Sequence, residues 1–151
     1  MKIRRITKGD KKDIFELAIE EDRLMRFFVS FPVYEKRLTK KSFEKLFKSY
    51  LKRDRFFYGI EFNKKVIGFI MGNIKKAPQG KVGYIDDLMI SRKYKGKGLS
   101  TKLKDAFFEW LKKRKIRYCQ LHLFWNNKNA FKIYKKWGFK IDGMQMTKKL
   151  K

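Results

Sequence analysis

A short glycine-containing segment has the residue types that bind phosphate groups. It is the run Lys95-Gly96-Lys97-Gly98-Leu99-Ser100, which lies between a predicted strand and a predicted helix. Glycine lets the backbone approach a phosphate closely, and the free N–H groups at a helix start point toward the anion. The run lacks the spacing of a Walker loop and that of a dinucleotide fingerprint. It therefore predicts an anion site, with a plain turn as the alternative.

Two adjacent acidic residues, Asp86 and Asp87, precede this loop in a strongly basic chain. The sequence has 41 Lys and Arg residues and 15 Asp and Glu residues, a formal net charge of +26. Neighbouring residues of a strand point to opposite faces, so we expect one carboxylate on each face. A carboxylate can act as a general base or bind a cationic ligand. The alternative is a structural pair in solvent at the strand end.

The chain has one histidine, His122, and one cysteine, Cys119. An imidazole can move a proton near neutral pH, so His122 is a candidate base; the alternative is a half-buried strand histidine with a satisfied hydrogen bond. Single residues of each type exclude a disulfide framework, a cysteine-only zinc site and a His-rich metal centre. No metal site is predicted.

Hydrophobic periodicity predicts the elements that must position these residues. Helices are expected after Asp10 and after the N-cap residue Thr39, and then over 99–113 and 127–137. Alternating or continuous apolar runs predict strands over 2–6, 56–62, 65–74, 81–90, 117–124 and 144–150.

The order of these elements predicts an α+β (mixed α/β) fold in which helices cover a mostly antiparallel sheet. Asn63-Lys64 has the length of a two-residue hairpin connection. The length of 151 residues fits a single domain over 1–151.

Composition limits the function classes without selecting one. No signal peptide or apolar run long enough to span a bilayer is visible, so we expect a soluble, cytoplasmic protein without a membrane partner. The positive charge fits nucleic acid, a membrane surface or an anionic cofactor, and equally a lysine-rich solvated surface. Nucleic acid is not favoured, and a homodimer is left open.

Two motifs in the expected order resemble those of the GNAT superfamily of N-acetyltransferases. The first, Arg/Gln-x-x-Gly-x-Gly/Ala, is matched imperfectly by Lys95–Ser100, with Lys95 in place of Arg or Gln and Ser100 in place of the last small residue. The second, Asn-x-x-Ala-x-x-x-Tyr-x-x-x-Gly-Phe, is matched at every defined position, by Asn127, Ala130, Tyr134, Gly138 and Phe139. The order of predicted elements also fits, so the resemblance covers nearly the whole chain.

The resemblance implies a GNAT-like fold, with a twisted sheet flanked by about four helices, and an acetyl-CoA-dependent N-acetyltransferase. It implies that the backbone of Leu88, Met89 and Ile90 pairs with the pantetheine arm. The loop of Lys95, Gly96, Lys97, Gly98, Leu99 and Ser100 would hold the pyrophosphate of coenzyme A. Asn127 would help to place the cofactor arm, and Tyr134 would protonate the departing thiolate.

The resemblance leaves two acceptor classes open. Spermidine/spermine-type enzymes carry a similar acidic pair, which likens Asp86 to a base acting through water and Asp87 to a ligand of a cationic amine. Some protein N-terminal acetyltransferases carry a histidine like His122, paired with a tyrosine at the position of Tyr84, and a substrate loop similar to Phe31-Pro32-Val33. We favour a small polyamine-like amine; the alternatives are a protein N-terminal or lysine amine and, from another class, a basic nucleic-acid-binding module.

Overall fold

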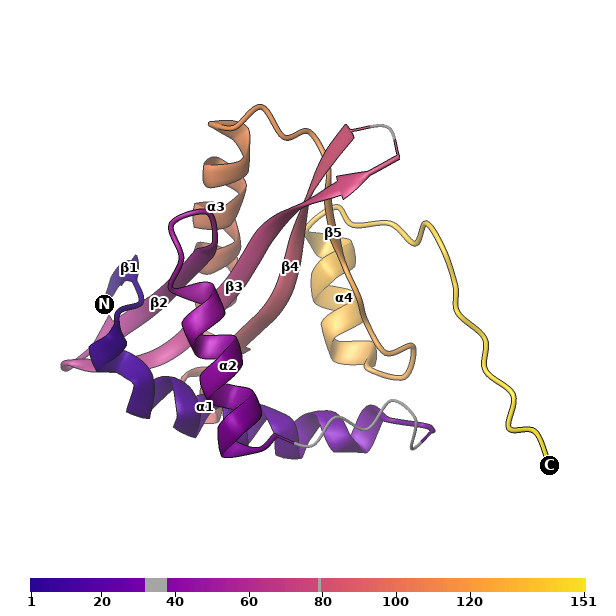
Figure 1. The fold of residues 1–151 in the computed structure, drawn as a ribbon, viewed down its shortest axis with the longest axis horizontal. Helices are drawn as coiled ribbons and strands as arrows, with labels where there is room; N and C mark the ends of the chain where they lie inside the picture. The colour runs from indigo at the N-terminus through magenta and orange to yellow at the C-terminus, as the bar shows by residue number, and fades with distance from the viewer. Residues whose placement is uncertain (32–37, 79) are drawn as a thin grey trace.

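The chain folds into one five-stranded sheet with helices on both faces, as seen in a computed structural model that describes residues 1–31, 38–78 and 80–151 (Figure 1). The elements in chain order are β1 (Lys2–Arg5), α1 (Lys11–Met25), α2 (Lys40–Tyr50), β2 (Phe56–Phe62), β3 (Lys65–Ala77), β4 (Gly80–Ile90), α3 (Leu99–Lys112), β5 (Cys119–Leu121) and α4 (Lys128–Lys136). Short 3₁₀ turns also occur within the described ranges: η1 (Lys8–Asp10), η2 (Arg26–Phe28) and η4 (Arg92–Tyr94).

The strands follow chain order across the sheet, β1-β2-β3-β4-β5. Strands β1 to β4 pair in antiparallel fashion, while β5 is parallel to β4. Asn63 and Lys64 connect β2 to β3 with φ of 50° and 60°, which is the backbone of a tight turn that matches the strand twist. The predicted hairpin and the predicted mostly antiparallel α/β architecture are confirmed.

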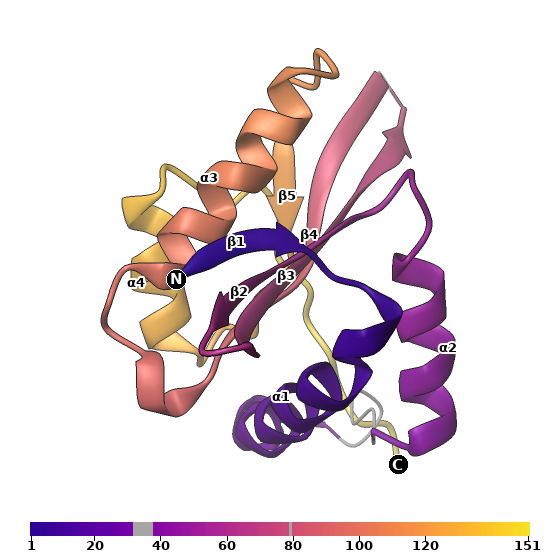
Figure 2. The ribbon, with the colours of Figure 1, turned by 90° about the vertical axis from the view of Figure 1, so that its left-hand side faces the viewer.

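The two faces of the sheet carry separate apolar layers (Figure 2). Helices α1 and α2 cover one face and enclose aromatic side chains such as Phe47, Phe57 and Phe69. Helix α3 covers the opposite face around Leu103 and Phe107. These buried layers hold β4, the strand with the acidic pair, between helices on both sides.

Two predicted strands differ from the structure. The last strand, predicted over Met144–Leu150, is wrong: residues 139–151 contain no helix or strand, and residues 140–151 are exposed. Met144 and Met146 are 84% and 92% exposed, and an extended segment becomes a stable strand only when its backbone and one face find a partner. Strand β5 is also shorter than the predicted 117–124.

None of the helices within the described ranges has the length and apolar content that crossing a bilayer requires.

Candidate active site

One edge of β4 loses its neighbouring strand halfway along. Its pairing with β5 covers only Gly83 to Ile85, opposite Cys119 to Leu121. Its other edge stays paired with β3 as far as Ile90. In the described chain, therefore, no strand lies beside Leu88–Ile90 on the β5 side. These are the residues whose backbone is expected to pair with the pantetheine arm, and an unpaired strand edge is what such pairing requires.

The loop after β4 has room for an anion at the start of α3. Gly96 and Gly98 have φ of 78° and 69°, the left-handed region that glycine adopts most readily. A Cβ atom built on either glycine would meet no other atom within 4 Å. Gly98 is the N-cap residue of α3 and has no side chain with which to cap the helix. No side chain of the N-cap residue therefore binds the first N–H groups of α3, and free N–H groups at a helix start are what a phosphate binds.

Asn127 has a structural task that its motif alone does not reveal. It is the N-cap residue of α4, and its side-chain oxygen accepts a hydrogen bond from the N–H of Ala130 at 3.2 Å. Side-chain caps of this kind satisfy one of the free N–H groups of a helix start. The cap fixes the first turn of α4, and with it the direction in which the helix presents Tyr134.

Tyr134 lies partly buried in the second turn of α4. Its ring packs against Trp137 and Phe139, with centroids 5.5 and 6.0 Å away. Burial, reinforced by the nearby carboxylates of Asp87 and Glu21, raises the pKa of Tyr134 to about 12. The phenol therefore keeps its proton at neutral pH and is available as a proton donor.

A bulge in β4 places both acidic residues on the same face of the sheet. Asp87 is opposite Met71 and Ile85 is opposite Gly72, so Asp86 is the extra residue. Asp86 contacts Tyr50 of α2, and Asp87 contacts Glu21 of α1; both helices cover one face. The expectation that the two carboxylates point to opposite faces is wrong, because a bulge interrupts the alternation of a regular strand.

Asp87 and Glu21 form a partly buried pair of carboxyl groups next to Tyr134. Burial raises the pKa of Asp87, and burial together with the charge of Asp87 raises the pKa of Glu21 well above its ordinary range. A hydrogen bond joins the two side chains, and it requires a proton on one of them. Each carboxylate disfavours ionisation of the other, so the pair holds a proton to a higher pH than separate carboxyl groups do.

The sequence interpretation did not include Glu21, although the sequence holds a signal for it. Ile14 and Leu17 are buried on α1, and Glu21 follows at the spacing of the same helical stripe. An acidic residue in an apolar stripe needs a partner or a function.

Asp86 is held by groups of the protein. Its carboxylate accepts hydrogen bonds from the hydroxyl of Tyr50 and the side-chain amide of Asn73, both of which are buried. Burial and the hydrogen bond to Asp86 raise the pKa of Tyr50. Lys75 places its ammonium 3.7 Å from the carboxylate. This network connects α2, β3 and the bulge of β4. It also occupies the carboxylate of Asp86, the residue that the resemblance likens to a base acting through water.

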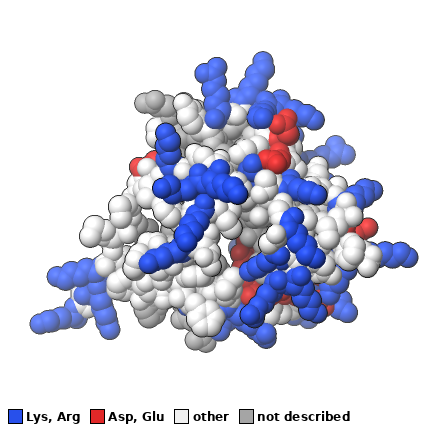
Figure 3. Space-filling model, turned by 180° about the vertical axis from the view of Figure 1, so that it is seen from behind, with Lys and Arg blue, Asp and Glu red and all other residues white. Residues whose placement is uncertain are grey.

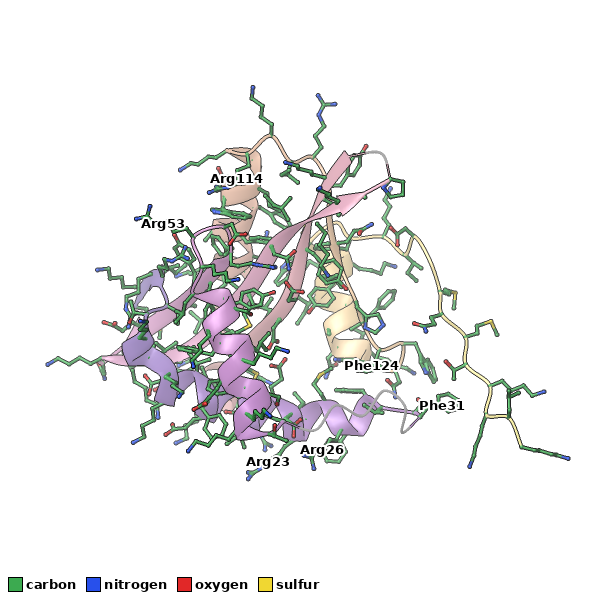
Figure 4. The ribbon with its side chains drawn as sticks, viewed as in Figure 1. Arg23, Arg26, Phe31, Arg53, Arg114 and Phe124 are labelled. Atoms are coloured by element: carbon green, nitrogen blue, oxygen red, sulfur yellow. The ribbon has the colours of Figure 1, made fainter. Side chains whose placement is uncertain are left out.

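The residues that suggest a protein acceptor are not joined to one another. His122 is exposed one residue beyond β5, with its ring edge-on to Phe124 at 5.5 Å. Tyr84 shares no hydrogen bond with His122 in the described part of the chain; instead the ammonium of Lys75 lies 3.3 Å from its ring centroid. Phe31 ends the first described range, and in Figure 4 it appears on the same side of the molecule as Phe124. Pro32 and Val33, the rest of that predicted loop, are outside the described residues.

The acidic group is a local exception on a basic surface. Figure 3 shows basic side chains spread over the rear face, with few acidic ones between them. Opposite charges at short range outweigh a distant field that salt screens within about 8 Å. The carboxylates of β4 and α1 can therefore attract a cation even though the net charge is +26.

Two pockets of the described structure are not lined by Tyr134 or Asp87. One, of about 240 Å³, lies between the ends of α3 and α4 and is lined by residues such as Leu111, Cys119 and Trp137. Burial raises the pKa of Cys119 to about 12, so this thiol keeps its proton at neutral pH, and the reactive form of cysteine is the thiolate. The other, of about 350 Å³, lies between Phe15 of α1 and Phe43 of α2. No group of three metal-binding side chains occurs among the residues with described positions.

Comparisons with known proteins agree with the fold. The chain is 31% identical over 146 residues to an uncharacterized N-acetyltransferase of Methanocaldococcus jannaschii, covering 91% of this chain and 59% of the relative. It is 29% identical over 91 residues to the spermine/spermidine N(1)-acetyltransferase of Bacillus subtilis, covering 56% of this chain and 59% of the relative. The chain thus spans about 59% of the length of the curated relatives that it matches.

A solved variant of a Bacillus halodurans protein has the same fold, with a TM-score of 0.84 at 16% identity over 99% of this chain and 100% of that one. The model of the acetyltransferase (GNAT) family matches residues 15–139, which include the glycine loop, the acidic pair and Tyr134. The chain therefore belongs to the acetyltransferase (GNAT) family.

Proposed function

We propose that the protein is an acetyl-CoA-dependent N-acetyltransferase whose acceptor is a small cationic amine. The observation that carries this proposal is the position of Tyr134 beside the Glu21–Asp87 pair. One group can give a proton and the other can bind an ammonium and take a proton, and aminolysis of a thioester needs both. The family membership supports the reaction class.

The residues expected to bind acetyl-CoA fit such a ligand. Leu88, Met89 and Ile90 have an edge without a neighbouring strand for the pantetheine arm. The segment Lys95–Ser100 combines two left-handed glycines and two lysines at the start of α3 for the pyrophosphate. Asn126, beside the cap residue Asn127, has a buried side-chain oxygen without a hydrogen-bond partner in the described structure. A buried polar atom of this kind is usually satisfied by a ligand or water.

In the proposed mechanism the Glu21–Asp87 pair accepts a proton from the acceptor, and Tyr134 donates a proton to the leaving thiolate. The acceptor binds as an ammonium at the Glu21–Asp87 pair, which takes its proton and leaves a neutral amine. The amine nitrogen attacks the thioester carbonyl carbon, and a backbone N–H of β4 near Met89 stabilises the oxyanion. The carbon–sulfur bond then breaks, and the hydroxyl of Tyr134 protonates the sulfur. The nitrogen, which became positively charged in the attack, gives its second proton to the Tyr134 phenolate, so that a neutral amide forms and the phenol is restored. A carboxyl pair with a raised pKa is a better base than an ordinary carboxylate.

Asp86 takes a positioning role in this proposal. Its carboxylate is already bound by Tyr50 and Asn73, so it fixes the bulge that directs Asp87 toward Glu21. His122, exposed and without a hydrogen bond to Tyr84, has no assigned step.

A panel of acceptors tests the proposal. Thiol release from acetyl-CoA is measured with spermidine, putrescine, n-pentylamine and a peptide with a free N-terminus. We expect turnover with the small cationic amines, a raised KM for them in Asp87→Asn, and little change in His122→Ala. Turnover confined to the peptide, with kcat lost in His122→Ala and a mild effect of Asp87→Asn, would contradict the acceptor assignment. Absence of turnover with every amine would contradict the enzymatic proposal.

A further inference from the structure

We propose that Tyr84 and Asp86 form a second cation subsite next to the Glu21–Asp87 pair, that the ammonium of Lys75 occupies it when no acceptor is bound, and that it selects small amines with two positive charges. This inference deepens the proposed function and rests on it for the chemistry of the acceptor. Its own content is a binding site for the ammonium that is not acetylated.

The side chain of Lys75 shows how a cation binds there. Its ammonium nitrogen lies 3.3 Å from the ring centroid of Tyr84 and 3.7 Å from a carboxylate oxygen of Asp86. A cation over an aromatic face is attracted by the ring quadrupole, and a carboxylate at this distance adds a direct charge interaction. The two groups together are a recognition element for an alkyl ammonium.

The remaining partners of Asp86 leave its charge available. Tyr50 and Asn73 donate hydrogen bonds to it as neutral groups, so they hold the carboxylate in place without cancelling its charge. Lys75 is the cation that lies against it in the described structure. When Lys75 leaves, the subsite keeps one unbalanced negative charge.

Lys75 is held weakly enough to be displaced. Its side chain is 46% exposed, and the side chain of Asp86 is 27% exposed. Solvent-accessible ion pairs contribute little because water screens them and the long side chain must be ordered. A ligand already anchored at its other end competes with a high effective concentration. A bound acceptor can therefore exchange with the lysine ammonium, which returns to water.

The bulge brings the two carboxylate centres onto one face of β4. Consecutive Cα atoms are about 3.8 Å apart, so Asp86 and Asp87 offer neighbouring negative charges toward α1 and α2. A diamine can place its reacting nitrogen at Glu21–Asp87 beside Tyr134 and its second nitrogen at Tyr84 and Asp86. An amine with an apolar end would place a methyl group against a carboxylate, which costs affinity.

The test measures binding and turnover separately for two amines of similar length. Putrescine carries a second ammonium where n-pentylamine carries a methyl group. Calorimetry gives the affinity of each amine for the wild type and for Lys75→Ala. The matched control is Lys76→Ala, which removes the same charge one residue along β3, from an exposed side chain. Tyr84→Leu removes the aromatic face.

We expect Lys75→Ala to bind putrescine roughly threefold to tenfold more tightly than Lys76→Ala does. The affinity for n-pentylamine should be nearly the same in the two variants. Tyr84→Leu should lower the affinity for putrescine by a similar factor and should lower the affinity for n-pentylamine less. Equal affinities of Lys75→Ala and Lys76→Ala for putrescine would overturn the subsite. If this binding difference is found but neither amine is acetylated, the subsite stands and the proposed enzymatic function fails.

Discussion

Replacing Glu21 by glutamine should make the protein more stable and less active at the same time. The raised pKa of Glu21, caused by burial and by the charge of Asp87, means that the folded state binds this proton more tightly than the unfolded state. Between the unfolded pKa of about 4.3 and the higher folded value, the free energy of unfolding therefore falls as the pH rises. Above that pH range Glu21 is ionised in both states, and the wild type is destabilised by the full cost of its buried charge.

The raised pKa of Glu21 gives the direction of the effect, and single substitutions typically alter the free energy of unfolding by about 0.5–3 kcal/mol. Each pKa unit corresponds to about 1.4 kcal/mol, and the partial exposure of the pair reduces what reaches the folding equilibrium. Glu21→Gln keeps the shape and can donate an amide N–H to Asp87 without titrating. We expect its free energy of unfolding at pH 8 to exceed that of the wild type by about 1–2 kcal/mol, and the difference to shrink toward pH 4.

Chemical denaturation at several pH values measures this difference in stability. The pH profile of kcat/KM measures the predicted loss of activity. With Glu21 gone, the acidic limb of the profile should move to lower pH, and kcat/KM for a cationic amine should fall. Glu16→Gln is the matched control: Glu16 is on the same helix, paired with Lys65 at 2.8 Å, and its pKa is lowered by that pair. It should lose a little stability and no activity. A Glu21→Gln variant that is less stable at pH 8 and fully active would refute the reasoning.

Two further predictions concern the anion loop and the first strand. Gly98→Glu should abolish binding of coenzyme A in calorimetry, whereas Gly98→Asn, which tolerates the φ of 69° better than other side chains, should retain more of it; equal, unchanged affinities would remove the pyrophosphate assignment. The guanidinium of Arg4 donates hydrogen bonds of 2.7 and 2.9 Å to the carboxylate of Asp10. These hydrogen bonds are the main reason that the pKa of Asp10 is lowered to about 2. Arg4→Met should therefore lose about 1–2 kcal/mol of unfolding free energy at neutral pH, a loss that disappears as the pH falls from 4 toward 2; a pH-independent loss would show that packing is the cause.

Local sequence signals accounted for most of the fold. The Asn63-Lys64 turn, the Thr39 cap and the apolar stripe of α3 each act over a few residues, and the structure confirms all three. The segment over 144–150 failed because alternation of apolar residues predicts an extended backbone without supplying the partner that it must pair with.

Candidate site residues could be predicted from the sequence where they belong to a motif. They could not be predicted where a bulge or a long-range contact determines the position of the side chain. Tyr134 and the glycine loop are candidates because they match the two family motifs. The shared face of Asp86 and Asp87 depends on one extra residue against Met71 and Gly72, which nothing in the sequence marks. The Glu21 contact depends on how α1 packs across the sheet.

Turnover of the Tyr134→Phe variant tests the central claim most directly. The variant keeps the ring that packs on Trp137 and Phe139 and loses only the hydroxyl that would protonate the thiolate. With acetyl-CoA and putrescine at saturation, we expect kcat to fall roughly hundredfold or more, with the affinity for acetyl-CoA nearly unchanged. Tyr118→Phe, which alters a tyrosine that is 72% exposed, should match the wild type. A Tyr134→Phe variant with the kcat of the wild type would contradict the assignment of this tyrosine as the proton donor.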